Sequence, residues 1–457
     1  MTNHSSLHAL AKDLTGEVIE PAQPSFDSHK TAFYDEYNDR TPQAIVRVAD
    51  AADVRRVIGY ARDTGSGLAV RAGGHSVLGH SSPDGGLLLD LSGLAAIDVD
   101  PERATAWAGG GVLAGDYTRA TGEHGLATGF GDTPSVGVSG ITLGGGVGFL
   151  HRKLGLTIDS LLAAEIVTAD GETRVIDAEN DPDLFWAIRG GGGNFGVLTR
   201  MKFRLHPIDA VVGGMMILPA TPELVTEFVA ASQEASDDLS VIAGVAVAPP
   251  LPFLPAEVHG QLIVMAFMVH AGDLATAERE VGRFRSMATP LVDGVQPMSY
   301  AEIYGDEEPP HPAAMSVRSV FSDGFTVEDA GAAIDALTSS TADMSVLQMR
   351  VLGGAVSRVS DDATAFGHRS RAMILNVAAA YQDPGSRPEH ETWVSDLSNR
   401  LASGTPGAAY LNFLGDDSPD AVRAAFPQST WEQLVDVKTK YDQDNLFSSN
   451  HNIPPRI

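Results

Sequence analysis

The chain has 457 residues, with 59 Asp and Glu against 31 Lys and Arg, and its formal net charge is -28. This charge excludes nucleic acid and anionic membrane surfaces as favoured partners. The absence of cysteine excludes disulfides, thiolate nucleophiles, cysteine-ligated metals and thioether bonds to a cofactor. A lysine-poor acidic surface is typical both of adaptation to salt and of a GC-rich genome, and composition leaves both explanations open.

Residues 1–8 lack the basic start and apolar run of a secretory signal. The most apolar later stretch, residues 261–269, is about half the length that a membrane span needs. We therefore expect a cytoplasmic protein with no membrane partner.

From residue 41 to 206, short apolar runs alternate with one helical pattern and with glycine-rich turns. The predicted strands cover 44–48, 67–70, 86–91 and 96–100, and the helix covers 51–61 and ends at Gly65. This alternation indicates an α/β or α+β unit.

Glycine density falls after residue 206, which gives the clearest domain boundary in the chain. Helices are predicted at 223–235, 274–287, 327–339 and 390–403, with strands at 262–269 and 373–380. The last fifty or so residues return to a loop-like composition. At this length, two or three domains are expected.

The segment 71–81 follows the strand at 67–70 and contains Arg71, a Gly73-Gly74 pair and His75. A glycine pair lets the backbone approach a ligand closely, and Arg71 suits a pyrophosphate. A bare Gly-Gly-His would be a tight turn with a surface histidine, but Arg71 and the following Gly79-His80 favour a ligand site. We expect no metal, because no carboxylate or cysteine spacing accompanies the two histidines.

Three further segments are rich in glycine or polar residues: 132–148, 183–199 and 441–455. The first contains a Gly-x-Gly-x-x-Gly pattern, which alone is weak. It begins after 130 residues and follows a proline-containing loop, and the acidic residue at the expected offset, Glu165, lies inside an apolar run. We therefore reject a Rossmann dinucleotide site. The second predicts a short helix, four glycines and a strand, and the third predicts a tail that packs onto a site.

In this order, the segments 71–75, 133–148, 183–199 and 438–453 resemble the FAD-linked oxidases of the vanillyl-alcohol oxidase/PCMH superfamily. The resemblance is to the berberine-bridge-enzyme-like branch, similar to bacterial 6-hydroxynicotine oxidases. It implies an α+β fold with a PCMH-type FAD-binding domain in two parts, residues 1–206 and 405–457. Residues 207–404 would form a substrate domain with an antiparallel sheet covered by helices.

The resemblance also implies FAD bonded covalently through its 8α-methyl carbon to His75. A second, cysteinyl link is absent, because Thr133 stands at the matching position. The implied FAD-binding residues come from all four segments: Arg71, Ala72, Gly73, Gly74, His75, Ser76, Gly79, His80, Thr133, Ser135, Val136, Gly137, Gly140, Thr142, Gly144, Gly145, Gly148, Asn194, Gly196, Val197, Asn450 and Asn452.

For catalysis, the resemblance points to Asn376 and Tyr410. Asn376 falls where relatives carry Glu or Gln, and an amide cannot act as a base. Residues 407–413 resemble the Tyr-x-Asn-Tyr strand of carbohydrate and alcohol oxidases, in which the tyrosine takes the proton of a hydroxyl. An ordinary phenol has a pKa of about 10, and we expect Asp416 and Asp417 to raise that of Tyr410.

The implied reaction is oxidation of a C–OH group of a small alcohol, sugar or secondary metabolite, with hydride transfer to flavin N5 and O2 as acceptor. Oxidation of a C–N bond in a cyclic amine is the alternative enzyme activity. A flavin-binding protein without redox turnover is the alternative of another class. The expected assembly is a monomer or a homodimer.

Overall fold

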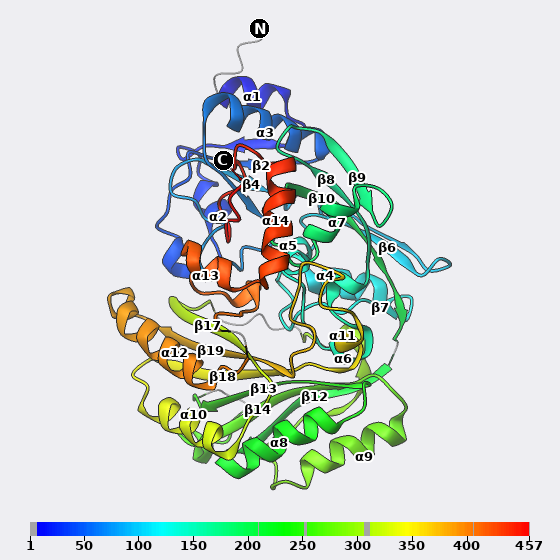
Figure 1. Cartoon of the computed structure of the whole chain (residues 1–457), viewed down its shortest axis with the longest axis vertical. Coiled ribbons are helices and arrows are strands. Elements are labelled where there is room, and N and C mark those ends of the chain that lie inside the picture. Colours follow the sequence, from blue (N-terminus) through cyan, green and yellow to red (C-terminus); the bar gives the residue numbers. More distant parts are fainter. Residues whose placement is uncertain (1–6, 209, 251–253, 306–310, 405, 457) are drawn as a thin grey trace.

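The computed structural model describes residues 7–208, 210–250, 254–305, 311–404 and 406–456. Most of the N-terminal segment examined for a signal, and residue 405 at a predicted domain boundary, lie outside these ranges. The upper half in Figure 1 contains α1 and the C-terminus, and the lower half contains a large sheet with helices beneath it. No helix of the described ranges is long and apolar enough to cross a membrane.

The first sheet has the order β1-β2-β4-β3, in which β2, β4 and β3 are parallel and β1 is antiparallel. Its strands are β1 Glu17–Ile19, β2 Ala44–Arg47, β3 Leu68–Arg71 and β4 Leu87–Asp90. Helix α3, Ala51–Thr64, begins where the Asp50 side chain accepts the Asp53 N–H and ends at Gly65 in the left-handed conformation. Strands β2, β3 and β4 confirm the predicted strands to within one residue at each end, and the helix ends at Gly65 as predicted, whereas β1 was not predicted.

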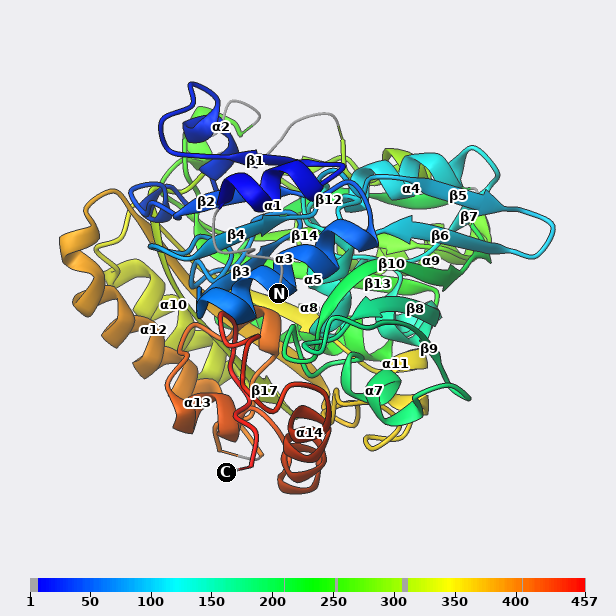
Figure 2. The same cartoon turned by 90° about the horizontal axis from the view of Figure 1, so that it is seen from above.

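The second sheet is antiparallel and has the order β5-β6-β10-β8-β9. Its strands are β5 Ile97–Asp100, β6 Thr105–Gly109, β8 Leu161–Val167, β9 Thr173–Asp177 and β10 Val197–Arg204; β7 Leu126–Ala127 pairs separately with β11 His206–Pro207. Figure 2 shows this sheet beside the first. The remaining short helices of this half are α1 Leu7–Asp13, α2 Phe26–Lys30, η1 Asp35–Tyr37, α4 Ala114–Gly122, α5 Val138–Leu143, α6 His151–Leu154, η2 Thr157–Asp159 and α7 Pro182–Ala187.

The lower half is one antiparallel sheet of order β15-β12-β14-β13-β18-β19-β17, with β16 also paired to β12. Its strands are β12 Ala210–Pro219, β13 Leu239–Val247, β14 Leu262–His270, β15 Val292–Asp293, β16 Gln296–Ser299, β17 Ala314–Ser322, β18 Met344–Val351 and β19 Met373–Tyr381. Its helices are α8 Pro222–Glu234, η3 Ala256–Val258, α9 Leu274–Arg285, η4 Tyr300–Glu302, α10 Val327–Ser339, α11 Gly354–Arg358, η5 Pro384–Ser386 and α12 Arg387–Leu401. The expected α+β fold, with an antiparallel sheet covered by helices, is confirmed.

The large sheet separates a helix-covered face from a face directed toward the upper half. On β19, Leu375 and Val377 belong to the apolar core shared with α8, α10 and α12. Because side chains alternate along a strand, Ile374, Asn376 and Ala378 lie on the other face, and Ile374 packs in a cluster with Tyr410. The sheet therefore presents Asn376 toward the upper half.

The C-terminal segment is more helical than its composition predicts. Helices α13, Pro419–Ala424, and α14, Gln428–Tyr441, precede the loop-like tail. The prediction of a loop-like end is wrong before residue 441, because α14 buries Leu434, Val437 and Tyr441 against the second-sheet core at helical spacing. The tail returns to the upper half in Figure 1.

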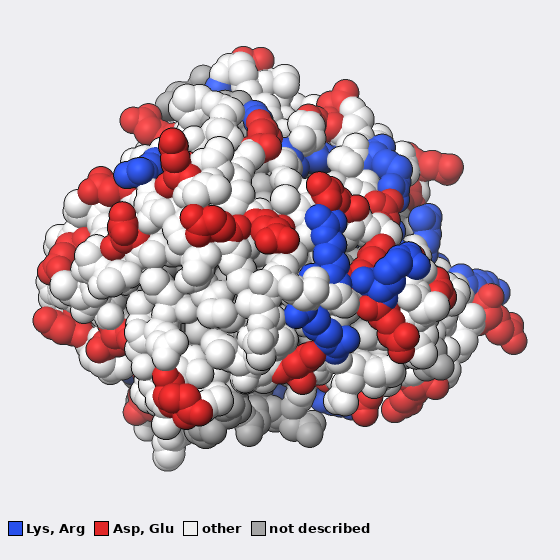
Figure 3. Space-filling view, turned by 90° about the horizontal axis from the view of Figure 1, so that it is seen from below, with Lys and Arg blue, Asp and Glu red and all other residues white. Residues whose placement is uncertain are grey.

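The lower surface carries acidic side chains widely and Lys and Arg side chains among them, mainly toward one side of the view in Figure 3. No continuous basic surface covers that face.

Lys438 fastens the C-terminal segment to the upper half. Its Nζ donates to the Asp442 carboxylate at 2.6 Å and to the carbonyl oxygens of Asn194 at 2.9 Å and Phe447 at 3.0 Å. Both side chains of the ion pair are fully buried, and burial lowers the pKa of Lys438. Three acceptors satisfy all three ammonium protons.

Replacing Lys438 with Met should destabilise the protein by about 3–5 kcal/mol, because it leaves the Asp442 carboxylate buried without its partner. Lys440→Met is the matched control, since Lys440 pairs with Asp183 at the surface and its loss should cost less than about 1 kcal/mol. Denaturant unfolding of both variants measures the difference. Equal small losses in the two variants would contradict the role of Lys438.

Candidate functional site: a cavity between two glycine-rich loops

The loop after β3 is held against the segment 131–148 by backbone contact. A Cβ atom on Gly73 would overlap Gly137 N and Ser135 O, so only glycine permits this approach. Gly74 has φ +75°, a left-handed conformation that favours glycine. The Gly-Gly pair therefore brings two loops together, and their joint edge forms one wall of a cavity.

His75 lies in that wall with its ring held on two sides. Its Nε2 is 3.0 Å from the Ser135 hydroxyl oxygen, and its ring stacks on Phe33 with centroids 4.2 Å apart. Burial, with a smaller effect of His311, lowers the pKa of His75 to about 4. The imidazole is therefore neutral and oriented near neutral pH.

Arg71 does not reach the cavity. Its buried guanidinium pairs with Asp90 at 2.9 Å and also donates to the carbonyl oxygens of Thr31 and His29. These partners use three N–H groups of the guanidinium, so that Arg71 holds the base of the loop at the end of β3. The expected direct contact with a pyrophosphate is not supported by this arrangement.

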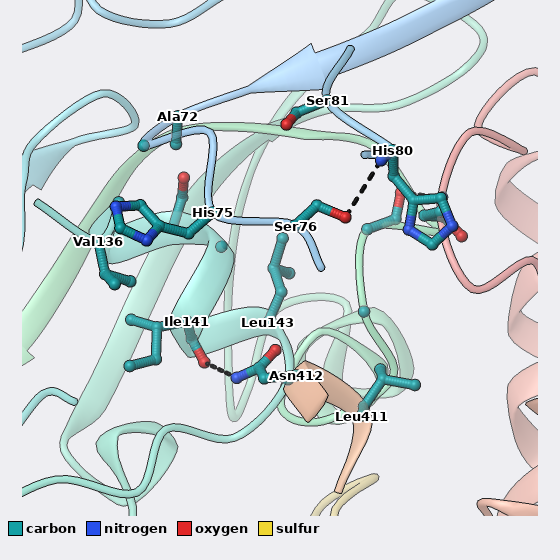
Figure 4. Close-up of a pocket in the computed structure, with 18 of the residues that line it drawn as sticks. Ala72, His75, Ser76, His80, Ser81, Val136, Ile141, Leu143, Leu411 and Asn412 are labelled. Atoms are coloured by element: carbon teal, nitrogen blue, oxygen red, sulfur yellow. Dashed lines mark hydrogen bonds between the residues drawn. The ribbon is translucent and has the colours of Figure 1, made fainter. Parts of the chain in front are cut away.

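The cavity has a volume of about 360 Å³. It is lined by Tyr410 and by most of the expected cofactor residues: Ala72, Gly73, Gly74, His75, Ser76, His80, Thr133, Val136, Gly137, Gly140, Gly144, Gly196, Val197 and Asn450. Figure 4 shows the His75 loop, Ile141 and Asn412 around this space. Within the His75 loop, the Ser76 hydroxyl oxygen accepts a hydrogen bond of 3.1 Å from the backbone N–H of His80.

Other expected residues do not line the cavity, and several of them fix the segments that do. A side chain at Gly79 would strike the Tyr37 ring, one at Gly145 would strike Phe366, and one at Gly148 would overlap Phe130 O. The Thr142 hydroxyl donates to Val138 O within α5. The members of this second set are Arg71, Gly79, Ser135, Thr142, Gly145, Gly148, Asn194, Asn376 and Asn452.

Asn194 organises the tail behind the cavity. Its Nδ2 donates to His451 O at 3.1 Å, and its Oδ1 accepts the Ile453 N–H at 2.9 Å. This places Asn450 and His451 in the lining. The Oδ1 atoms of Asn450 and Asn452 are buried without a hydrogen-bond partner among the described residues.

Tyr410 is 2% exposed and lies in the cavity wall, but it is not on a strand. It precedes a 3-10 helix, η6 Leu411–Phe413, so the expected strand is wrong here. Burial raises the pKa of Tyr410, and the expected effect of the two following carboxylates is absent. Asp416 pairs with Arg318 at 3.3 Å, and Asp417 approaches His80 at 3.6 Å.

Sequence reasoning missed the charged part of the lining. Arg350, on β18, is 2% exposed and pairs with Asp132 at 2.6 Å. Its guanidinium lies 4.6 Å from the ring centre of Phe413. Among the described residues these two are the only Asp, Glu, Lys or Arg in the lining. Asp132 stands in the segment 132–148, whereas nothing local marked Arg350, because the fold brings it from a distant strand.

The lining residues fit FAD. Leu68, Leu91 and Val197 supply an apolar part for a flat ring. Buried Ser81 Oγ and His451 Nδ1 lack hydrogen-bond partners among the described residues, which a ligand with hydroxyls and phosphate oxygens would satisfy. Because Arg350 and Asp132 neutralise each other, the described lining offers no unpaired Lys or Arg to a pyrophosphate. Backbone N–H groups and hydroxyls would therefore hold it.

Two family models match the chain: an FAD binding domain at residues 42–177 and a berberine and berberine-like segment at residues 409–454. (R)-6-hydroxynicotine oxidase of Paenarthrobacter nicotinovorans is 30% identical over 99% of this chain and 99% of its own length. Tetrahydroberberine oxidase of Berberis wilsoniae is 28% identical over 91% of this chain and 85% of its own length.

Solved structures show the same similarity. The structure of 6-hydroxy-D-nicotine oxidase from Arthrobacter nicotinovorans has a TM-score of 0.86 at 28% identity and covers 97% of this chain and 99% of its own. A chitooligosaccharide oxidase shares the fold with a TM-score of 0.83 at 22% identity, covering 98% and 99%. The chain therefore belongs to the berberine-bridge-enzyme-like family of FAD-linked oxidoreductases, as its motifs predicted, and is an FAD-dependent oxidoreductase.

Gly140 offers a direct test of the cavity. It lines the cavity, and a Cβ atom there would meet nothing within 4 Å, so Gly140→Leu should fold while its side chain fills the FAD site. We expect at least tenfold less flavin per purified chain, because the leucine side chain and FAD would compete for the same space.

The matched control is Gly59→Leu, in α3 outside the lining, where the added Cβ also meets nothing within 4 Å. Flavin absorbance per chain and thermal unfolding are measured on both variants. Full flavin content in a folded Gly140→Leu protein would show that FAD does not occupy this cavity.

Proposed function

We propose that the protein is an oxidase whose FAD is bonded to His75 and which oxidises a C–OH group of a small molecule. FAD, when bound, would accept the hydride from the substrate carbon and pass the electrons to O2. The observation that carries this proposal is the presence of His75 and Tyr410 in the lining of one cavity. We further propose the division into residues 1–206 with 405–457 for FAD and 207–404 for the substrate.

His75 is suited to covalent attachment by its protonation and its orientation. A bond from a ring nitrogen requires the neutral imidazole, and burial keeps the pKa of His75 near 4. Ser135 engages Nε2, while Nδ1 makes no hydrogen bond within the described ranges. We therefore propose Nδ1 as the nitrogen that bonds to the flavin 8α-methyl carbon.

Tyr410 would take the substrate's hydroxyl proton. Its oxygen accepts hydrogen bonds from Asn412 Nδ2 at 2.8 Å and from Gly146 N at 3.2 Å. Because both groups are donors here, neither of them accepts the phenol's own proton. The neutralised Asp132–Arg350 pair leaves no free carboxylate in the described lining to attract a cation. This arrangement favours an uncharged hydroxyl substrate over an ammonium ion.

Oxidation of a C–N bond stays the second candidate. The 30% identity with (R)-6-hydroxynicotine oxidase over nearly the whole chain favours it. A neutral amine needs no base to release hydride. Asn376 lies on the sheet face toward the upper half, and its amide could not act as a base there, which is compatible with an amine substrate. If Asn376 contacts the substrate, its unpartnered Oδ1 would accept a hydrogen bond from a hydroxyl or an amine.

His75→Ala should remove the covalent bond without removing the cavity, because the ring only lines it. Wild-type protein should give a yellow pellet after acid precipitation, and the variant should release its FAD into the supernatant. His80→Ala, a second histidine of the same loop, should keep a yellow pellet. Flavin retained in the denatured His75→Ala pellet would contradict the assignment.

Tyr410→Phe should slow flavin reduction by the true substrate by about 100-fold or more, which is typical for loss of a general base. Sugars, alcohols and cyclic amines are screened for bleaching of the flavin without oxygen, and the best substrate is then used for stopped-flow reduction. Tyr381→Phe is the control, since Tyr381 lies outside the cavity and bonds Ser316.

Unchanged reduction of an alcohol by Tyr410→Phe would exclude Tyr410 as the base. Bleaching by cyclic amines alone would replace C–OH with C–N oxidation.

A further inference from the structure

Tyr410 differs from Tyr37 and Tyr304 in the direction of its hydrogen bonds. Tyr37 Oη donates to Val77 O at 2.9 Å, and Tyr304 Oη donates to Gly131 O at 3.2 Å. Burial raises the pKa of both phenols, that of Tyr37 to about 12. Tyr410 Oη instead accepts two hydrogen bonds and, among the residues that the structure describes, donates none.

The amide of Asn412 is oriented so that its NH2 group faces the phenol. Nδ2 donates to Tyr410 Oη at 2.8 Å and also to Ile141 O at 3.2 Å, as the dashed line in Figure 4 shows for Ile141. Because a backbone carbonyl only accepts, the contact with Ile141 excludes the flipped amide. A Cβ atom on Gly144 would overlap Asn412 Oδ1, so glycine there provides the space for this orientation.

The second donor to the phenol oxygen is the backbone N–H of Gly146, and its position depends on glycine at this residue. Gly146 has φ +78°, which favours glycine, and a Cβ atom there would overlap the Thr157 side chain. Thr157 N in turn donates to Gly146 O at 2.9 Å. The glycines at 144 and 146 thus shape a pocket for the phenol oxygen, and this use is separate from any contact with phosphate.

Charge adds to these two donors. Arg350 stacks on Phe413, whose ring centroid is 5.2 Å from that of Tyr410. Burial raises the pKa of Tyr410, whereas the Asn412 amide, the Arg350 charge and the N–H groups of Gly146 and Val147 lower it. Donors aimed at an oxygen stabilise its anion more than its neutral form.

We propose that Asn412 and the Gly146 N–H form an anion hole for the Tyr410 phenolate, with Asn412 as a positioning residue that makes Tyr410 a competent base. The inference rests on the proposed role of Tyr410. In the proposed reaction, the phenolate of Tyr410 would take the proton of the substrate O–H bond as C=O forms, and bound FAD would supply the acceptor for the C–H hydride. In this role Asn412 acts through the phenol, to which its Nδ2 donates.

The test is an ultraviolet titration of tyrosinate absorbance in the holoenzyme, with the Tyr410→Phe titration subtracted to isolate Tyr410. Asn412→Leu removes the donor and should raise the Tyr410 pKa by about one unit, a tenfold change in ionisation constant. Asn412→Asp places a like charge beside the phenolate and should raise it further. Asn399→Leu, at an exposed position of α12, should leave it unchanged.

A second readout is the pH profile of flavin reduction in single turnover, whose acid limb should move upward in the same order. Flavin content and thermal unfolding show whether each variant is folded. If Asn412→Leu does not fold, Asn412→Asp alone provides the comparison with the wild type. Two results would overturn the inference. One is a Tyr410 pKa that is the same in the wild type and in the Asn412 variants; the other is a Tyr410 pKa no lower than the pKa values of the other buried tyrosines.

The titration needs no substrate, so it separates this inference from the proposed reaction. If Tyr410 titrates as expected but Tyr410→Phe reduces alcohols normally, the anion hole stands and the proposed base role fails. If reduction depends on Tyr410 but Asn412 variants titrate unchanged, the base stands and the anion hole fails.

Discussion

The close backbone contact between the loop after β3 and the segment 131–148 determines the geometry of the whole site. At Gly73 and Gly137 the two segments approach so closely that a Cβ atom on either glycine would overlap the backbone of the other segment. This contact sets the His75 ring against Ser135 and makes the two loops one continuous wall. A small displacement there would move the nitrogen that we propose to carry FAD.

The second wall of the cavity comes from distant parts of the chain. Tyr410 and Asn412 follow the large sheet in sequence, yet they pack on the glycines at 144 and 146. Lys438 and Asn194 hold the tail that contributes Asn450 and His451. The glycines at 73, 137, 144 and 146 let separate segments of the chain meet at the cavity.

Local patterns predicted what local physics determines. The ends of α3 follow from a capping aspartate and a left-handed glycine, and the largely apolar run that predicts a strand at 373–380 is β19, which is buried on both faces. Most of the residues that the family motifs predicted for the cofactor line the cavity. Arg71 matched its motif but serves the fold, because its ion pair with Asp90 is a contact between two strands that sequence spacing does not reveal.

Arg350 and the hydrogen bonds of Tyr410 could not be predicted for a related reason: both depend on which distant elements meet. The proposed attachment of FAD to His75 is tested most directly by mass spectrometry of proteolytic peptides from the denatured wild-type protein. The peptide containing His75 should carry the flavin. An unmodified His75 peptide, with all flavin released as free FAD, would contradict it.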